Sequence, residues 1–274
     1  MKTISKKKRL LCVIISVVIL FIGVSIIMGR PPIITIKGIP YYTYRKKLDL
    51  THGNLQDRNL KSLKYMKDLT YLSLFTEDEI TDISFLNEMS SLKELYLCLR
   101  RVEDLSPISN CKDLEVFYVW AGDFPDLSVF KELTNLKVLD LLENNVGDIS
   151  DVKYLVNLER FSIYGSEISD ISALKDLKKL ESLSIVGGKI DDISVLGELS
   201  NLESLIFSEN KYLVDISSLK NLNKLQTLSL NDTNISDYSV VLELPNLQKL
   251  YVDEGVLTDK ELRILKEKGV EVRE

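Results

Sequence analysis

The stretch that decides the fold is LERFSIYGSEISDISALKDLKK, residues 158–179, because the next residues repeat its pattern as LESLSIVGGKIDDISVLGELSN, starting at Leu180. Self-similarity at a fixed period of roughly 20–50 residues is typical of solenoids. Apolar residues fall at unit positions 1, 4, 6, 11, 14, 17 and 20. Positions 4 and 6 alternate as in a strand, and the later positions step by three, as in an extended or 3₁₀-like return. Each unit therefore predicts one coil, with a strand on one face and an apolar return on the other.

The same unit recurs along most of the chain. Successive units start 22 or 23 residues apart, and a degenerate first unit near Arg45 brings the total to about ten. No coil can bury its leucines alone, so stacking between neighbouring coils must supply the core. The full units start at Leu69, Leu92, Leu114, Leu136, Leu158, Leu180, Leu202, Leu225 and Leu247.

Over about residues 45–274 this pattern resembles the leucine-rich repeat family. The 22-residue length and the recurrent Asp-Ile-Ser are similar to the internalin-type bacterial subclass, and phosphatase-regulator repeats of eukaryotes are a second relative. The resemblance implies a β-rich α/β right-handed solenoid, with a parallel sheet on the concave face and mostly 3₁₀ or extended segments on the convex face. It also implies an asparagine at position 9 that bonds neighbouring turns. Only Asn144 and Asn210 fit, so we expect the other turns to be looser.

The amino-terminal segment predicts a membrane anchor. Residues 1–9 are basic, and residues 10–28 form an uncharged apolar run that would span ~28 Å as a helix, close to the thickness of a bilayer core. Basic flanks stay in the cytoplasm, so the repeats would lie outside the cytoplasmic membrane. The alternative is a secretory signal peptide, whose cleavage would release a secreted protein. Residues 29–44 are then a linker or amino-terminal cap.

The carboxyl-terminal segment, residues 258–274, predicts a helical cap on repeats that occupy residues 45–257. Residues 258–268 read TDKELRILKEK, in which Thr258 and Glu261 have capping-box spacing and Gly269 follows as a stop signal. A short strand over residues 270–272 would follow the helix. A polar cap of this kind keeps the last coil of a solenoid soluble.

Composition argues against several classes of function. All of the first 30 residues' charges are basic, so residues 31–274 hold 29 of the 35 basic residues and all 41 acidic ones, which disfavours a nucleic-acid partner. His52 is the single histidine and no Cys/His cluster exists, so we expect no zinc site and no cofactor. Cys98 and Cys111 should lie on opposite sides of the core wall, too far apart to bridge. No catalytic constellation is present, and we expect a non-enzymatic protein.

An Asp-x-Ser sequence recurs eight times and allows two interpretations. A column of carboxylates could bind calcium, but calcium needs several oxygens that converge on one point, and one aspartate per coil forms a row. The pattern therefore favours local hydrogen bonds from each aspartate to backbone N–H groups at the start of the return. The aspartates are Asp82, Asp104, Asp126, Asp148, Asp170, Asp192, Asp215 and Asp237.

The concave face carries the signal for function. Side chains at positions 3, 5, 7 and 8 should point away from the core, because side chains alternate along a strand. Contiguous exposed apolar patches usually mark interaction sites, and Trp and Tyr are common anchors. We predict recognition of a protein partner here, and a cell-wall glycan and self-association into an envelope structure remain alternatives. The predicted site residues are Tyr71, Phe75, Tyr96, Tyr118, Trp120, Leu142 and Tyr164.

Overall fold

The computed structural model describes residues 30–51, 55–74, 80–98, 100–122, 124, 126–144, 146–164 and 167–274. Residues 10–28, for which the sequence predicts a membrane segment, and His52 lie outside these ranges. Within them, no helix has the length and apolar character needed to cross a bilayer. Anchoring through residues 10–28 therefore stays a prediction.

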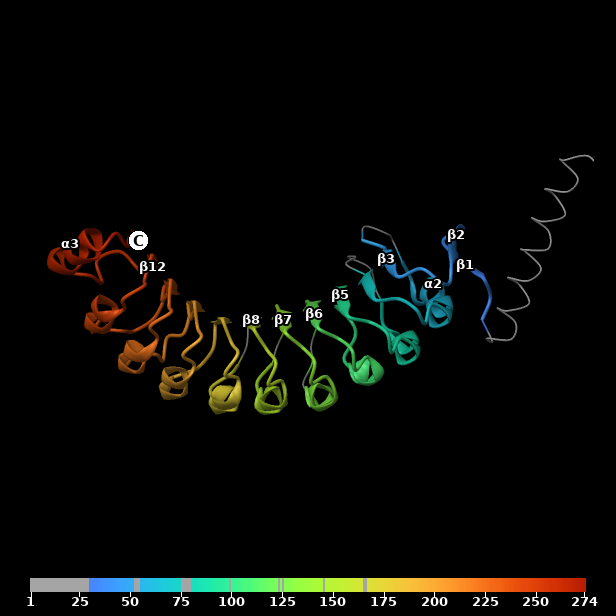
Figure 1. Ribbon diagram of the computed structural model, residues 1–274, viewed down its shortest axis with the longest axis horizontal. Coiled ribbons are helices and arrows are strands. Elements are labelled where there is room, and N and C mark those ends of the chain that lie inside the picture. The colour runs from blue at the N-terminus through green and yellow to red at the C-terminus, as the bar shows by residue number, and fades with distance from the viewer. Residues whose placement is uncertain are drawn as a thin grey trace, which may run out of the picture.

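The described coils stack into an arc, with a parallel sheet along the concave side and 3₁₀ helices along the convex side (Figure 1). This confirms the predicted leucine-rich repeat solenoid. Equivalent residues pair across neighbouring strands, for example Phe117 with Leu139 and Leu139 with Phe161. The strands of this sheet are β3 (Lys47–Asp49), β4 (Tyr71–Leu74), β5 (Glu94–Cys98), β6 (Val116–Trp120), β7 (Val138–Leu142), β8 (Arg160–Tyr164), β9 (Ser182–Val186), β10 (Ser204–Ile206), β11 (Thr227–Ser229), β12 (Lys249–Tyr251) and β13 (Glu271–Arg273).

The repeated Asp-x-Ser sequence starts each 3₁₀ helix from η2 onward. In all eight copies an aspartate oxygen accepts a hydrogen bond from the backbone N–H of the serine two residues later, at 2.7–2.9 Å. These bonds confirm the local interpretation of the motif, and they lower the pKa of carboxyls such as Asp126. The helices are η1 (Lys61–Tyr65), η2 (Ser84–Glu88), η3 (Ser106–Asn110), η4 (Ser128–Glu132), η5 (Ser150–Tyr154), η6 (Ser172–Asp176), η7 (Ser194–Glu198), η8 (Ser217–Asn221) and η9 (Ser239–Glu243).

The core is one continuous column of apolar side chains between the sheet and the 3₁₀ helices. The apolar positions read from the repeat are buried as predicted, and burial of each Leu or Ile side chain contributes ~1.5–3 kcal/mol of transfer free energy. The unit at residues 158–179 is typical, and its buried side chains are Leu158, Phe161, Ile163, Ile168, Ile171, Leu174 and Leu177.

Both ends of the solenoid are closed by non-repeat structure. At the amino end, β1 (Ile33–Ile36) and β2 (Ile39–Tyr42) form an antiparallel hairpin, and α2 (Asp57–Leu60) precedes η1. This hairpin was not predicted from the sequence, and its two-residue turn needs positive φ at both Lys37 and Gly38.

At the carboxyl end, α3 (Asp259–Glu267) covers the last coil. The predicted capping box is present, because the Thr258 hydroxyl accepts from the Glu261 N–H and the Glu261 carboxylate accepts from the Thr258 N–H. The short strand also forms, one residue later than expected, as β13 beside β12.

Candidate binding face

The predicted site residues that the structure describes lie on five neighbouring strands of the concave sheet, β4 to β8. We call the described members the aromatic stripe; Phe75 lies outside the described residues. The register places Tyr96 beside Tyr118 and Trp120 beside Leu142, because equivalent residues pair across parallel strands. The stripe consists of Tyr71, Tyr96, Tyr118, Trp120, Leu142 and Tyr164.

One half of the stripe is a ladder of tyrosine rings. The ring centroids of Tyr71 and Tyr96 are 5.4 Å apart at an interplanar angle of 40°, and those of Tyr96 and Tyr118 are 5.1 Å apart and nearly parallel at 12°. The Lys47 ammonium lies 5.6 Å from the Tyr71 centroid and extends the stack at its amino end. The Tyr96 hydroxyl donates to the Glu94 carboxylate at 3.4 Å. Burial and the nearby Glu94 charge raise the pKa of Tyr96 to about 12, so this phenol remains a neutral donor.

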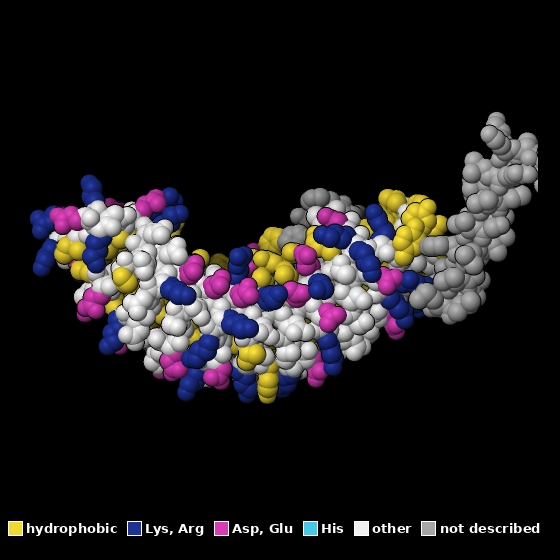
Figure 2. All heavy atoms as spheres, in the orientation of Figure 1, with side chains coloured by type: hydrophobic (Ala, Val, Ile, Leu, Met, Phe, Trp, Pro, Cys, Tyr) yellow, Lys and Arg dark blue, Asp and Glu magenta, His cyan; other side chains and the backbone are white. Residues whose placement is uncertain are grey.

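The other half of the stripe is more open. Leu142 is 42% exposed and Tyr164 is 38% exposed, whereas Trp120 is half-buried. Between β6 and β7 a hollow of about 230 Å³ is lined by Tyr118, Trp120, Asp140 and Leu142. Figure 2 shows hydrophobic side chains gathered on the concave edge over β5 and β6, with charged side chains along the flank. The stripe therefore combines an ordered stack with an accessible apolar hollow.

Asp140 is the acidic residue that lines this hollow. Burial raises the pKa of Asp140 to about 6, although hydrogen bonds from the Ser162 hydroxyl and the Leu142 N–H act in the opposite direction. No described cation forms an ion pair with this carboxylate. Its ionisation therefore lacks the compensation that a salt bridge would give.

Not every outward position is exposed. Cys98 occupies position 7 of its unit, which the alternation places on the concave face, yet it is only 4% exposed. The small side chain of Cys98 lies in register beside the large indole of Trp120. Cys98 and Cys111 form no disulfide with each other, as the sequence predicts.

The two buried position-9 asparagines explain why two other units carry a glycine at position 9, Gly122 and Gly188. Asn144 Oδ1 accepts a hydrogen bond from the Gly122 N–H at 2.8 Å, from one coil to the previous one. A Cβ at Gly122 would lie 2.9 Å from that oxygen and 2.0 Å from the Phe124 ring, so only glycine permits the approach. A Cβ at Gly188 would meet Asn210 Oδ1 in the same way, at 2.8 Å. Each position-9 asparagine thus has a glycine one coil earlier, a spacing that could have been found in the sequence.

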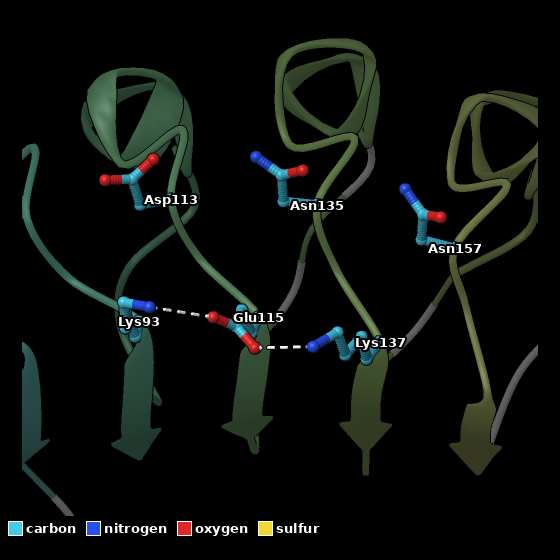
Figure 3. Close-up of a pocket in the computed structure, with 6 residues that line it drawn as sticks. All are labelled: Lys93, Asp113, Glu115, Asn135, Lys137 and Asn157. Carbon is cyan, nitrogen blue, oxygen red and sulfur yellow. Dashed lines mark hydrogen bonds and ion pairs between the residues drawn. The ribbon is translucent and has the colours of Figure 1, made fainter.

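A polar row flanks the stripe where the chain enters the strands. The Glu115 carboxylate accepts from Lys93 at 3.1 Å and from Lys137 at 2.7 Å, and Figure 3 shows these side chains in a row at the start of neighbouring strands. Hydrogen bonds from both lysines lower the pKa of Glu115. Asn135 and Asn157 form a second row, in which each amide donates to a backbone carbonyl of the preceding coil. These groups already satisfy one another, so the row joins coils and offers a ligand less than the aromatic stripe does.

Comparisons with known proteins agree with this geometry. No protein-family model and no curated protein sequence matches the chain. Among solved structures, the chain is similar to an internalin, inlF, from Listeria monocytogenes, with 24% identity, a TM-score of 0.66 and coverage of 86% of both chains. It is also similar to internalin C2 from the same organism, with 29% identity, a TM-score of 0.65 and coverage of 69% of this chain and 83% of that one.

A plant protein shares the fold as well. This is the leucine-rich repeat ectodomain of the membrane receptor kinase GASSHO1/SCHENGEN3 from Arabidopsis thaliana, in complex with CASPARIAN STRIP INTEGRITY FACTOR 2. The identity is 22% and the TM-score 0.62, over 74% of this chain and 26% of the plant chain. Fold and repeat pattern together define a leucine-rich repeat protein. Within that class the chain is internalin-like.

Proposed function

We propose that this chain is a non-enzymatic binding module that recognises a protein partner through the aromatic stripe. In this proposal residues 10–28 anchor it in the cytoplasmic membrane and the repeats lie outside. The observation that carries the proposal is the tyrosine ladder, which continues on the same concave sheet into the half-buried Trp120 and the exposed side chains of Leu142 and Tyr164.

The order already present in the ladder favours tight binding. Each immobilised side chain at an interface typically costs ~0.5–1.5 kcal/mol of conformational entropy on binding. Tyr96 packs against the tilted ring of Tyr71 on one side and stacks on Tyr118 on the other, so much of that cost has been met during folding. Aromatic rings held in this way are the side chains that most often dominate interface energies.

The sheet itself sets the kind of partner that fits. Neighbouring strands lie about 4.8 Å apart, so the stripe presents a row of rings along the solenoid axis. A polypeptide segment that crosses several coils could contact Tyr71, Tyr118 and Tyr164 in succession. The plant ectodomain above, solved in complex with its factor, supports protein binding by this fold. Concave residues farther along are acidic, including Glu209, Asp232 and Asp253, and would favour a partner with a basic end.

The test is a comparative capture experiment with the full chain in detergent. Surface extracts are passed over the native protein, a Tyr96→Ala, Trp120→Ala, Tyr164→Ala variant, and a control with Tyr154→Ala and Tyr212→Ala. The control removes aromatics that are 40% and 60% exposed outside the stripe. All three proteins are first shown to unfold at comparable temperatures.

We expect one partner that is retained by the native protein and the control and lost by the stripe variant. Equal capture by all three proteins would place the site elsewhere. Concentration-dependent dimerisation that Trp120→Ala abolishes would favour self-association, and retention of purified wall polysaccharide in place of a protein would favour a glycan.

A further inference from the structure

A second apolar surface lies on the amino-terminal hairpin, away from the aromatic stripe. We call it the hairpin face; it consists of Ile33, Tyr42 and Tyr44. These side chains are 45%, 53% and 45% exposed. The register pairs Ile33 with Tyr42, which puts both on one side of the hairpin, and the rings of Tyr42 and Tyr44 lie 5.2 Å apart. Figure 2 shows this cluster of hydrophobic side chains at the β1–β2 end of the arc.

The inner side of the hairpin packs against the core, so the hairpin is a folded part of the solenoid and its outer side is an ordered surface. Ile34 and Ile36 are 4% and 2% exposed and belong to the hydrophobic core. Thr43 is also buried, where its hydroxyl donates to the carbonyl of Pro31 at 2.7 Å. The hairpin is therefore held firmly on the solenoid while it presents isoleucine and tyrosine outward. Exposed apolar patches of this kind mark interaction surfaces.

The charge around the hairpin is opposite to that of the rest of the protein. Residues 30–47 contain five basic residues and no acidic one, whereas all 41 acidic residues lie beyond residue 47 with 25 basic ones. Arg30 is paired with Asp68 at 2.6 Å, but Lys37 at the tip of the hairpin and Arg45 beyond it are exposed. The amino-terminal cap is thus a basic, apolar end on an acidic solenoid.

The chain length ties this end to the predicted membrane segment. Only four residues separate Met28, the last residue of the apolar run, from Ile33 at the start of β1. A fully extended chain covers at most ~3.6 Å per residue, so the start of the hairpin can lie no more than ~18 Å from the end of that run. A hairpin on so short a tether cannot leave the neighbourhood of the bilayer surface.

We propose that the hairpin face docks on the anionic lipid headgroups of the membrane that residues 10–28 cross. This inference rests on the membrane anchor of the proposed function and is independent of the aromatic stripe. Tyrosine and isoleucine enter the boundary between headgroups and acyl chains, where aromatic residues concentrate. Lys37 and Arg45 contact the anionic headgroups. The acidic repeats are repelled by the same surface, so the arc stands away from the membrane with its concave face accessible.

The test places a fluorescent reporter on the hairpin of the full chain. A Trp120→Phe background removes the native tryptophan, and Tyr42→Trp introduces a new one. The protein is reconstituted into vesicles of equal parts phosphatidylcholine and phosphatidylglycerol, with bromine on the upper acyl carbons of the lipids. Tyr212→Trp in the same background is the matched control, because Tyr212 is 60% exposed and lies after β10, many coils away from the hairpin. A third protein adds Lys37→Glu and Ile33→Asp to the hairpin reporter.

We expect the brominated lipids to reduce the Tyr42→Trp fluorescence roughly twofold, since side chains that dock in this way lie ~5–10 Å inside the headgroup boundary. The Tyr212→Trp control should be unaffected, and the charge-reversed hairpin should lose the quenching although it still floats with the vesicles. An unquenched Tyr42→Trp protein that floats with vesicles would overturn the docking and leave the anchor intact. Failure to float would overturn both, and partner capture by the aromatic stripe would still be measurable separately.

Discussion

Replacement of Asn144 by alanine is the sharpest test of how the coils are joined. The side chain is fully buried and makes three hydrogen bonds: its Oδ1 accepts from the Gly122 N–H at 2.8 Å, and its Nδ2 donates to the carbonyls of Leu142 at 2.9 Å and Val119 at 3.1 Å. Asn144→Ala removes all three at once. The buried Gly122 N–H then has no acceptor from this side chain.

The expected loss follows from these contacts. A buried polar group left without its partner costs ~1–3 kcal/mol, and the two carbonyls add a smaller cost because they retain other lone pairs. We therefore expect Asn144→Ala to lower the free energy of unfolding by about 2–4 kcal/mol. Asn210 is the less clean choice, since its buried Oδ1 has no hydrogen-bond partner among the described residues.

The assay is urea unfolding followed by circular dichroism, with Asn135→Ala as the matched control. Asn135 is exposed and donates one hydrogen bond, to the Lys112 carbonyl at 2.9 Å, so its replacement should cost less than about 1 kcal/mol. Equal losses for the two variants would refute the reasoning that the buried amide joins the coils. A change in the slope of the unfolding free energy against urea concentration would show that the repeats no longer unfold together.

Three further predictions follow from individual side chains. Burial raises the pKa of Asp140 from its ordinary value of 3.8 to about 6 in the folded protein. Between these two values the folded state keeps the carboxyl protonated while the unfolded state ionises it, so the free energy of unfolding falls as the pH rises through about 6. Asp140→Asn should therefore stabilise the protein by about 1–2 kcal/mol near pH 8 and have little effect near pH 4, and a pH-independent effect in urea titrations would contradict this. Glu209 has a φ of 62°, which disfavours any side chain, so Glu209→Gly should raise stability by about 0.5–1 kcal/mol, whereas Glu198→Gly in η7 should lower it. Thermal unfolding of both variants checks the pair. Burial raises the pKa of Cys111 to about 12, so iodoacetamide should modify it only after unfolding, and labelling of the native protein seen by mass spectrometry would refute its burial.

Much of the fold could be predicted because its determinants are local and repeated. Each coil places Leu, Ile or Phe at the same positions, and all nine full repeat units agree. The strands, the 3₁₀ returns and the buried residues could therefore be predicted from the sequence. The Asp-x-Ser hydrogen bonds could be predicted as well, since donor and acceptor lie two residues apart. The capping box at Thr258 belongs to the same group.

The hairpin was missed because its signal is weak at the level of single residues. Its turn is Lys-Gly rather than one of the commonest hairpin pairs, and Pro32 and Pro40 flank or interrupt the strands. Pro40 is tolerated because this two-stranded sheet leaves each strand with a free edge. The hairpin is stabilised by burial of Ile34 and Ile36 against the first coil, which no local sequence pattern reveals.

For the candidate site, too, some features could be predicted from the sequence and others needed the tertiary structure. The sequence by itself determined which side chains face the concave side, since alternation along a strand and a fixed repeat length settle direction. Only the tertiary structure decided that Tyr96 and Tyr118 stack in parallel, that Cys98 is buried beside Trp120, and that Asn144 closes on Gly122. Those features depend on the contact between one coil and the next. Position in a repeat sets the direction of a side chain, whereas the size of its neighbour one coil away sets whether solvent can reach it.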